Sequence, residues 1–258
     1  MKLCAVIPAA GRGTRLGADR PKILVPLVPP LTIWSILRRT LQSFVDHIHV
    51  VVSPDGRPLF EAELAAEPGR PEVSVSVQPE PRGMGDAIFC GLPVWGSAEN
   101  ILIIWGDQVH VSAETLTACR AVHLSGKGPH CTLPLVALDE PYVEYVFDAS
   151  GRLDRVLQTR EGDLCNPGGL GDVGTFLLST AGLEKLWREY VSLVPGGAVT
   201  GELNFLPFLV FLTRRGWPVN RVSVADSTEA RGINTPEDLA FFRRLYTHPN
   251  DLFNRKVS

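Results

Sequence analysis

The 258-residue sequence lacks a strong excess of charge of either sign. Its 25 Lys and Arg and 28 Asp and Glu residues give a formal net charge of −3, and the basic residues are scattered along the chain. Binding to a nucleic-acid backbone needs a concentrated basic field, so we expect no nucleic-acid partner. Long apolar runs are also missing, since no stretch reaches the roughly 20 residues of a membrane-spanning helix. We therefore expect no membrane partner.

Paired cysteines and a secretory leader are missing as well. The five cysteines are odd in number, widely spaced and form no C-x-x-C pair, which favours reduced thiols. The N-terminal MKLCAVIPAA lacks the long apolar core and cleavage site of a signal peptide. We therefore expect a cytoplasmic protein in which a cysteine such as Cys4 packs in the core and is not a nucleophile.

The residues that are present predict a globular α/β protein. With 45% apolar residues and no Ser/Gly-rich linker, the chain can form a single domain over 1–258 with two lobes. Residues 3–8, 32–44 and 47–53 read as strand, helix and strand, an order that predicts a Rossmann-like, mostly parallel sheet flanked by helices. The pattern continues with a helix over 57–66, a strand over 73–78, a helix over 85–92, a strand over 101–105 and a helix over 114–124.

After about His130 the chain becomes richer in strands. Residues 131–138, 142–148 and 152–158 follow one another as strands, and a hairpin-type turn joins the last two. The remaining elements are a strand over 172–179, helices near 183–191 and 202–213, a strand over 219–225 and a helix over 236–245. We therefore expect a first lobe over 1–128 and a strand-rich second lobe over 129–258.

The first strand leads directly into a loop of small residues that includes Ala9, Ala10, Gly11 and Gly13. Such a loop leaves backbone N–H groups open to an anion, and ligands of open α/β sheets bind beyond the carboxyl ends of strands. Two common phosphate loops are excluded, because a third glycine of G-x-G-x-x-G would fall at Leu16 and no Gly-Lys-Ser/Thr follows. A simple tight turn is the alternative.

Two cations favour a phosphate site over a simple turn. Arg15 follows Gly11 by four residues and Lys22 follows it by eleven, so one loop can present a guanidinium and an ammonium to the same polyphosphate. The alternative is that both are solvated surface charges.

Residues 7–16, IPAAGRGTRL, followed by Pro21 and Lys22, resemble the opening motif of the sugar-1-phosphate nucleotidyltransferases. They are most similar to the uridylyltransferase domain that makes UDP-N-acetylglucosamine. Four further blocks occur in the family's order, at Gln78–Ala87, Trp105–Asp107, Asp172–Gly174 and Gly232–Asn234. The resemblance implies a nucleotide lobe, a strand-rich acceptor lobe and a cleft between them. It also implies transfer of a nucleoside monophosphate from a nucleoside triphosphate to a small phosphorylated acceptor, with release of pyrophosphate.

The resemblance assigns roles to individual residues on the nucleotide side. Nucleotide contacts are implied for Pro8, Ala9, Ala10, Gly11, Gly13, Thr14, Gln78, Gly83, Met84 and Gly106. Arg15 and Lys22 are the candidate catalytic cations. Arg15 would hold the departing pyrophosphate, and Lys22 together with the metal would offset charge on the α-phosphate and the incoming phosphate. Gln78 and Gly83 match base-contacting positions, which favours UTP. Met84 stands where the closest relatives have threonine, so CTP and dTTP stay open.

Asp107 and Asn234 are the candidate ligands of a Mg²⁺ cofactor. Asp107 follows the apolar strand 101–105 and Gly106, where a carboxylate at a strand end suits a hard cation. The family's metal aspartate occupies this Gly-Asp position, although such an aspartate can also be only a turn residue. Asn234 is the second implied ligand, or it helps to begin the helix that Thr235 and Pro236 predict.

Three positions of the implied acceptor pocket depart from the family pattern. Glu144 stands where a glycine is expected, Gln158 where a glutamate is, and Asp172 where an asparagine is. We therefore expect an acceptor other than N-acetylglucosamine 1-phosphate, namely a different sugar, a cyclitol phosphate or an alcohol phosphate or phosphonate. Sequence drift around the same sugar is the alternative. A cytidylyltransferase and a catalytically silent nucleotide-binding homologue stay open as functions, and so does a homo-oligomeric state.

Overall fold

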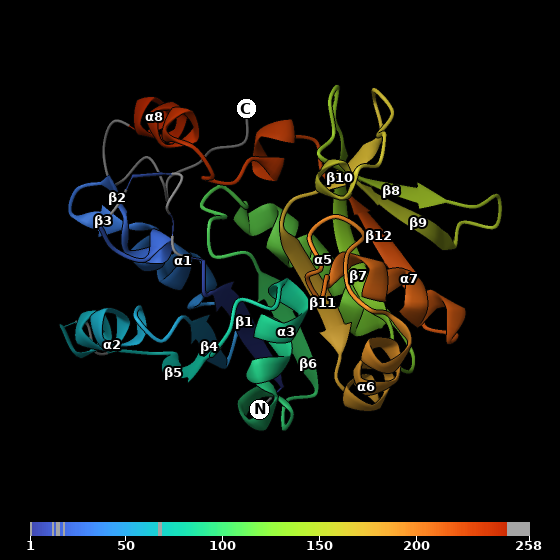
Figure 1. Cartoon of the computed structure of the whole chain (residues 1–258), viewed down its shortest axis with the longest axis horizontal. Coiled ribbons are helices and arrows are strands. Elements are labelled where there is room, and N and C mark those ends of the chain that lie inside the picture. The colour runs from blue at the N-terminus through green and yellow to red at the C-terminus, as the bar shows by residue number, and fades with distance from the viewer. Residues whose placement is uncertain (1, 12, 14–15, 18, 67–68, 247–258) are drawn as a thin grey trace.

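The computed structural model describes residues 2–11, 13, 16–17, 19–66 and 69–246, which form a mixed sheet of eight strands between helices (Figure 1). The strands of this sheet are β1 (Leu3–Ala9), β4 (His47–Val52), β5 (Glu72–Val77), β6 (Asn100–Ile104), β7 (Cys131–Ala137), β10 (Leu170–Asp172), β11 (Thr175–Ser179) and β12 (Val219–Ser223). Their order is β10-β7-β11-β6-β1-β4-β5, and β12 pairs with β7. The predicted α/β fold is confirmed.

Helices cover both faces of the sheet. They are α1 (Ile33–Leu41), α2 (Arg57–Ala66), α3 (Met84–Cys90), α4 (Leu92–Trp95), α5 (Ala113–Ser125), α6 (Leu183–Leu193), α7 (Leu206–Arg214) and α8 (Pro236–Leu245). Short 3-10 turns are η2 (Lys22–Leu24), η3 (Thr159–Glu161) and η4 (Ser227–Ala230). Two small hairpins stand apart from the main sheet, β2 (Pro26–Val28) with β3 (Leu31–Thr32), and β8 (Val143–Phe147) with β9 (Leu153–Gln158).

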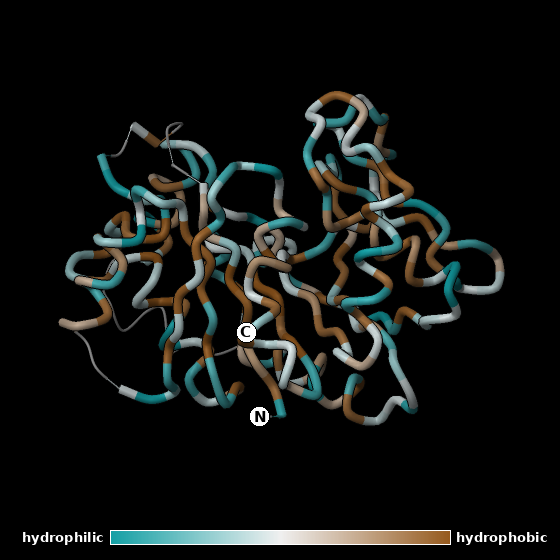
Figure 2. Tube along the Cα trace, turned by 60° about the horizontal axis from the view of Figure 1, so that its bottom comes forward, coloured by the Kyte–Doolittle hydropathy of each residue, from teal (hydrophilic) through white to brown (hydrophobic). Residues whose placement is uncertain are grey.

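The first strand shows why the central strands are apolar along their whole length. Ala5 and Ile7 belong to a core that includes residues of α1, α2, α5 and α8, whereas Cys4 and Val6 belong to a second core with residues of α3, α4, α6 and α7. A strand buried on both faces reads as a continuous apolar run. Figure 2 shows this as brown segments through the middle of the molecule and teal segments in the peripheral loops.

Three predicted elements differ from the observed ones. The predicted strand 172–179 is split into β10 and β11, because Gly174 takes a left-handed φ of +70° and its carbonyl accepts from the backbone N–H of Trp105. The predicted helix 85–92 ends at Cys90, and α4 restarts with a proline in its first turn, where no N–H is needed. The predicted helix 202–213 begins only at Leu206.

The sheet continues through both predicted lobes. The second-half strands β7, β10, β11 and β12 extend the sheet of β1, β4, β5 and β6, and β11 pairs with β6 in antiparallel register. The β8–β9 hairpin projects from this second half, at the right of Figure 1. In the first half, β1 has parallel neighbours on both sides, β4 and β6, so their carboxyl ends meet at one edge of the sheet. Ligand sites of open α/β folds lie at such edges.

All five cysteines are free thiols. Cys4, Cys119 and Cys131 are fully buried, and burial raises the pKa of Cys4 and of Cys119 to about 12. Such thiols stay protonated near neutral pH and act as packing groups. Across the part of the chain that the structure describes, no helix combines the length and the apolar character needed to cross a membrane.

Candidate active site

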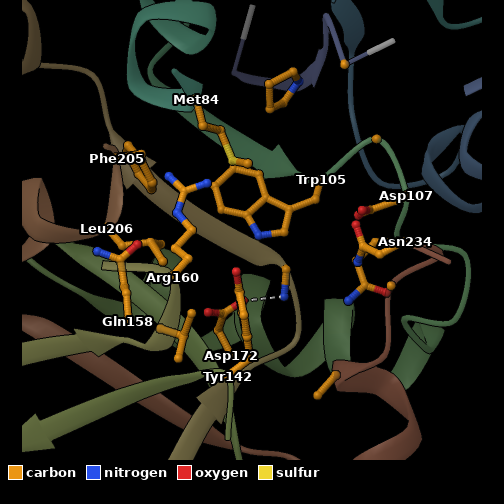
Figure 3. A pocket seen from close by; sticks show the side chains of 18 of the residues that line it. Met84, Trp105, Asp107, Tyr142, Gln158, Arg160, Asp172, Phe205, Leu206 and Asn234 are labelled. Carbon is orange, nitrogen blue, oxygen red and sulfur yellow. Dashed lines mark hydrogen bonds between the residues drawn. The ribbon is translucent and has the colours of Figure 1, made fainter. Parts of the chain in front are cut away.

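A cavity of about 510 Å³ lies at the carboxyl ends of β1 and β6 and extends toward the β8–β9 hairpin. Figure 3 shows Asp107 and Asn234 at one end, Arg160 and Gln158 at the other, and the indole of Trp105 between them. The two ends of the cavity are therefore chemically different, one rich in oxygen ligands and the other formed by aromatic, apolar and amide groups with one guanidinium.

Lys22, Asp107 and Asn234 converge at the first end. The Lys22 ammonium donates to Asp107 Oδ2 at 2.6 Å and to Asn234 Oδ1 at 2.9 Å. The side chains of Lys22 and Asp107 are 21% and 15% exposed, so the pair is shielded but reachable from the cavity. The Lys22 ammonium therefore lies between two hard oxygen donors, where a bound metal cation could also lie.

The local structure leaves the Asn234 side chain free for the cavity. Thr235, and not Asn234, caps α8, because its side chain accepts from Asp238 N while the Asp238 carboxylate accepts from the N–H groups of Asn234 and Thr235. Asn234 is also tied to Asp107 through the backbone, since Ile233 N donates to Asp107 O at 3.1 Å. The capping role that the sequence left open for Asn234 thus belongs to Thr235.

Small residues at the ends of β1 and β6 allow the backbone to approach these groups. Pro8, Ala9, Gly11 and Gly106 line the cavity. Gly13 packs directly on Lys22, since an added Cβ would lie 3.1 Å from Lys22 Cβ, and its φ is +66°. Ala10 and Gly13 are not among the lining residues. The predicted contacts of Thr14 and Arg15 lie outside the described residues.

On the predicted base side, Met84 lines the cavity but Gln78 and Gly83 do not. Gln78 is buried, and its amide nitrogen donates to Gly83 O at 2.9 Å and to Asp86 Oδ2 at 2.8 Å. Gly83 precedes α3 with a left-handed φ of +110°. Gln78 therefore fixes the start of α3, and through it the position of Met84.

The three predicted acceptor residues are placed differently. Gln158 and Asp172 line the cavity, whereas Glu144 does not. The Glu144 carboxylate instead accepts from the backbone N–H and the side-chain amide of Asn166, and so fixes the loop that follows η3. Asp172 accepts from Gly174 N at 2.7 Å and from Tyr145 Oη at 2.9 Å. Burial raises the pKa of Asp172 above its ordinary value.

Aromatic side chains form much of the second end of the cavity. Trp105 contacts Phe176 with ring centroids 4.8 Å apart and Phe205 at 6.0 Å. Tyr142 also lines the cavity and is 59% exposed. Flat aromatic surfaces beside the amide of Gln158 suit an acceptor with both apolar and hydrogen-bonding faces.

Residues 5–159 match the family of the MobA-like NTP transferase domain. The chain belongs to this family. It is 30% identical over 251 residues to bifunctional protein GlmU of Chromohalobacter salexigens, covering 95% of this chain and 52% of that protein. It is 28% identical over 249 residues to bifunctional protein GlmU of Acidithiobacillus ferrooxidans, covering 93% and 51%. The chain spans about half the length of these curated relatives. The family predicted from the sequence motifs is confirmed.

The cavity of this NTP transferase domain holds residues that the sequence did not single out. Arg160 lines it from η3, and Asn204, Phe205 and Leu206 line it from the start of α7. The Arg160 guanidinium donates from Nη2 to Glu202 Oε2 at 2.9 Å and to Asn204 Oδ1. These contacts span more than forty positions of sequence, so no local motif marks them, and Arg160 reads in the sequence as an ordinary surface charge.

Residues 202–204, which we call the strap, connect the predicted base side to the acceptor end. Leu203 N donates to Arg82 O at 2.7 Å, and Gly85 N donates to Leu203 O at 2.9 Å. An added Cβ on Gly83 would lie 2.8 Å from Glu202 Cβ and from Leu203 N. The backbone around Gly83 therefore lies directly against the strap, and the strap in turn holds Arg160.

The donor set at the Lys22 end fits a divalent hard cation. Asp107 offers a carboxylate and Asn234 an amide oxygen, and both accept from the positively charged Lys22 ammonium. Among the described residues, no three His, Cys, Asp or Glu side chains gather closely enough to form a protein cage around a metal. Two protein ligands leave coordination positions for phosphate oxygens and water, as magnesium sites commonly do.

Proposed function

We propose that this NTP transferase domain transfers a nucleoside monophosphate from a nucleoside triphosphate, preferably UTP, to the phosphate of a sugar-1-phosphate-like acceptor. Pyrophosphate is released and Mg²⁺ is the cofactor. The observation that carries the proposal is the convergence of Lys22, Asp107 and Asn234 at one end of a cavity whose other end suits an acceptor. Residues 1–128 serve as the nucleotide-binding lobe in this proposal and residues 129–258 as the acceptor lobe.

The proposed reaction needs no general base. A phosphate monoester is already anionic, so one of its oxygens attacks the α-phosphorus while the bond to the bridging oxygen of pyrophosphate breaks. Consistent with this, none of the described histidines lines the cavity. The task of the protein is then to position two anions in line and to offset their charge.

In this proposal, charge compensation comes from the metal ligands Asp107 and Asn234 and from Lys22. Asp107 and Asn234 would hold Mg²⁺, which supplies charge compensation to the α-phosphate when bound. With a metal on Asp107, the Lys22 ammonium is available to the incoming phosphate. Pro8, Ala9, Ala10, Gly11, Gly13, Thr14 and Gly106 belong to the proposed nucleotide-binding surface. Arg15 is proposed as the cation that holds the departing pyrophosphate.

The base preference rests on the segment from Gln78 to Met84. Gln78 and Gly83 act by placing Met84 against the nucleotide, because their own hydrogen bonds are directed within the protein. The thioether of Met84 can pack adaptably against a base, but it does not recognise the base's hydrogen-bonding groups. A surface that reads no hydrogen-bonding edge admits cytosine as well as uracil, so a cytidylyltransferase acting on a cyclitol or alcohol phosphate or phosphonate is the second candidate.

The acceptor is proposed to bind between Gln158, Asp172 and the aromatic wall. Asp172 is fixed by two donors, whereas no hydrogen bond to a described residue takes up the side-chain amide of Gln158. Gln158 can therefore hydrogen-bond a hydroxyl or another polar group of the acceptor directly. Glu144 contributes indirectly, through the loop that Asn166 begins.

One matrix of assays tests the proposal. Pyrophosphate release is measured with four nucleoside triphosphates against a panel of sugar 1-phosphates, cyclitol phosphates, alcohol phosphates and phosphonates, with and without Mg²⁺. We expect release to require Mg²⁺ and both substrates, with UTP ahead of CTP and with N-acetylglucosamine 1-phosphate a poor acceptor. Nucleotide binding without release in any combination would instead identify a catalytically silent homologue.

A further inference from the structure

Arg160 is a cation at the acceptor end that the proposed transfer does not use. Figure 3 shows its guanidinium beside Met84 and Trp105, across the indole from Asp107 and Asn234. Lys22 and Asp107 form a pair at the other end. Among the described lining residues, Asp107 and Asp172 are the carboxylates, and Tyr145 and Gly174 occupy the oxygens of Asp172. The Arg160 end therefore offers a ligand a guanidinium, and the nearby lining carboxylate, Asp172, already accepts from two other donors.

The carboxylate partners of Arg160, Glu202 and Glu161, are not among the residues that line the cavity. Glu202 contacts Nη2 at 2.9 Å, and Glu161 Oε1 lies 3.8 Å from Nε. Glu161 is already occupied, since it accepts from Val199 N, from Thr200 and from Asn204 Nδ2. The hydrogen bonds of Arg160 to described residues leave from Nη2. A guanidinium carries five N–H donors, so Nη1 can donate to a ligand while the strap is held.

We propose that Arg160 sets acceptor specificity by binding a second anionic group of the acceptor, such as a carboxylate, away from the phosphate that reacts beside Lys22. This inference rests on the proposed function. The Arg160 side chain is 29% exposed, so it is reachable from the cavity.

The test compares matched pairs of phosphates by calorimetry, without the need for turnover. One pair is glucose 1-phosphate and glucuronic acid 1-phosphate, and the other is glycerol 3-phosphate and 3-phosphoglycerate. Each is titrated into the full chain with Mg²⁺, in the absence and presence of α,β-methylene-UTP, which blocks transfer. We expect the carboxylate member of at least one pair to bind about tenfold tighter or more, as a charge-assisted hydrogen bond supplies.

Variants assign that preference to Arg160. Arg160→Gln should bring the ratio within the pair close to one, and Arg160→Lys should retain part of it. Glu202→Gln should increase it, because it removes the competing carboxylate. Arg155→Gln, at an exposed position of β9, should leave it unchanged. Equal binding in both pairs, or a preference that survives Arg160→Gln, overturns the inference. So does equal weakening of both members by Arg160→Gln, which would show that Arg160 only fastens the strap.

Failure of the proposed function gives a different result. If no nucleoside triphosphate and acceptor release pyrophosphate, the transfer is refuted, yet the pairwise binding ratios still report on Arg160. If pyrophosphate is released while the ratios stay at one, the transfer stands and the role of Arg160 is refuted.

Discussion

The ammonium of Lys22 donates to the carboxylate of Asp107 at 2.6 Å, across 85 positions of sequence. This contact joins the loop after β1 to the loop after β6, and Asn234 completes it from just before α8. The pair is shielded from solvent, so its electrostatic interaction is stronger than that of an exposed ion pair. Lys22 therefore lies at the place where the proposed Mg²⁺ and the two phosphorylated substrates would bind.

Asp107→Ala is expected to abolish metal-dependent turnover while the protein stays folded. The substitution removes the only carboxylate among the proposed metal ligands and leaves Lys22 with Asn234 alone. Without this ligand the phosphate charges stay uncompensated, and pyrophosphate release against Mg²⁺ concentration measures the loss. Asp154→Ala, at an exposed position of β9, is the matched control. Wild-type rates for Asp107→Ala at saturating Mg²⁺ would refute the assignment.

Gln158→Ala is expected to impair the acceptor and not the nucleotide. The side chain is only 4% exposed and lines the acceptor end of the cavity. Removing a group that hydrogen-bonds an acceptor hydroxyl should lower kcat/KM for the acceptor by roughly two decades or more, with KM for the nucleotide unchanged. Gln42→Ala, at the exposed end of α1, should change neither constant. An equal rise in both KM values would show that Gln158 has only a structural role.

Glu161→Gln is expected to destabilise the protein at neutral pH but not in strong acid. Burial of Glu161 opposes ionisation, but hydrogen bonds from Thr200, Val199 N and Asn204 prevail and lower its pKa from 4.5 to about 2. Because the folded pKa lies below the unfolded one, this stabilisation is present above pH 4.5 and is lost as the pH falls toward 2.

Urea unfolding of wild type and Glu161→Gln measures this effect. The variant should be less stable by roughly 3 kcal/mol at pH 7, from the size of the pKa shift, and the difference should shrink steadily between pH 4.5 and pH 2. A difference that does not depend on pH would show that Glu161 stabilises through packing alone.

Gly83→Ala is expected to displace the strap and weaken binding at both ends of the cavity. The added Cβ would lie 2.8 Å from Glu202 Cβ and Leu203 N, and φ at this position is +110°. Gly182→Ala is the matched control, since its φ is +82° but no heavy atom lies within 4 Å of the added Cβ. Backbone strain of about 1 to 3 kcal/mol is common to both variants.

Kinetic measurements separate the effect of the steric clash with the strap from that of backbone strain. Gly83→Ala should raise KM for nucleotide and acceptor together, whereas Gly182→Ala should lower only the thermal stability. If the two variants behave alike, the contact between Gly83 and the strap has no functional consequence.

The sequence predicted those features that depend on neighbouring residues. The helices over 57–66 and 236–245 were predicted with the bounds of α2 and α8, because periodicity and capping are local signals. The glycine loop after β1 and Asp107 after β6 follow equally from strand ends, where a parallel sheet collects its loops.

Features that depend on long-range pairing could not be predicted. The helix predicted from residue 202 begins at Leu206, because the backbone of Leu203 bonds Arg82 and Gly85 instead of starting a helical turn. No local signal marks Arg160, because its partners in the strap lie more than forty residues away. The Gln78–Gly83 hydrogen bond is local, across five positions, but the motif alone does not tell whether the amide points to a base or to the backbone.

Tracing isotopic label from the nucleotide tests the central claim most directly. The protein is incubated with Mg²⁺, the best acceptor of the panel and a nucleoside triphosphate labelled either at the α- or at the γ-phosphorus. If the cavity at Lys22 and Asp107 performs nucleotidyl transfer, α-label should appear in the acceptor product and γ-label only in pyrophosphate. Transfer of γ-label to the acceptor, or its release as inorganic phosphate, would contradict the account.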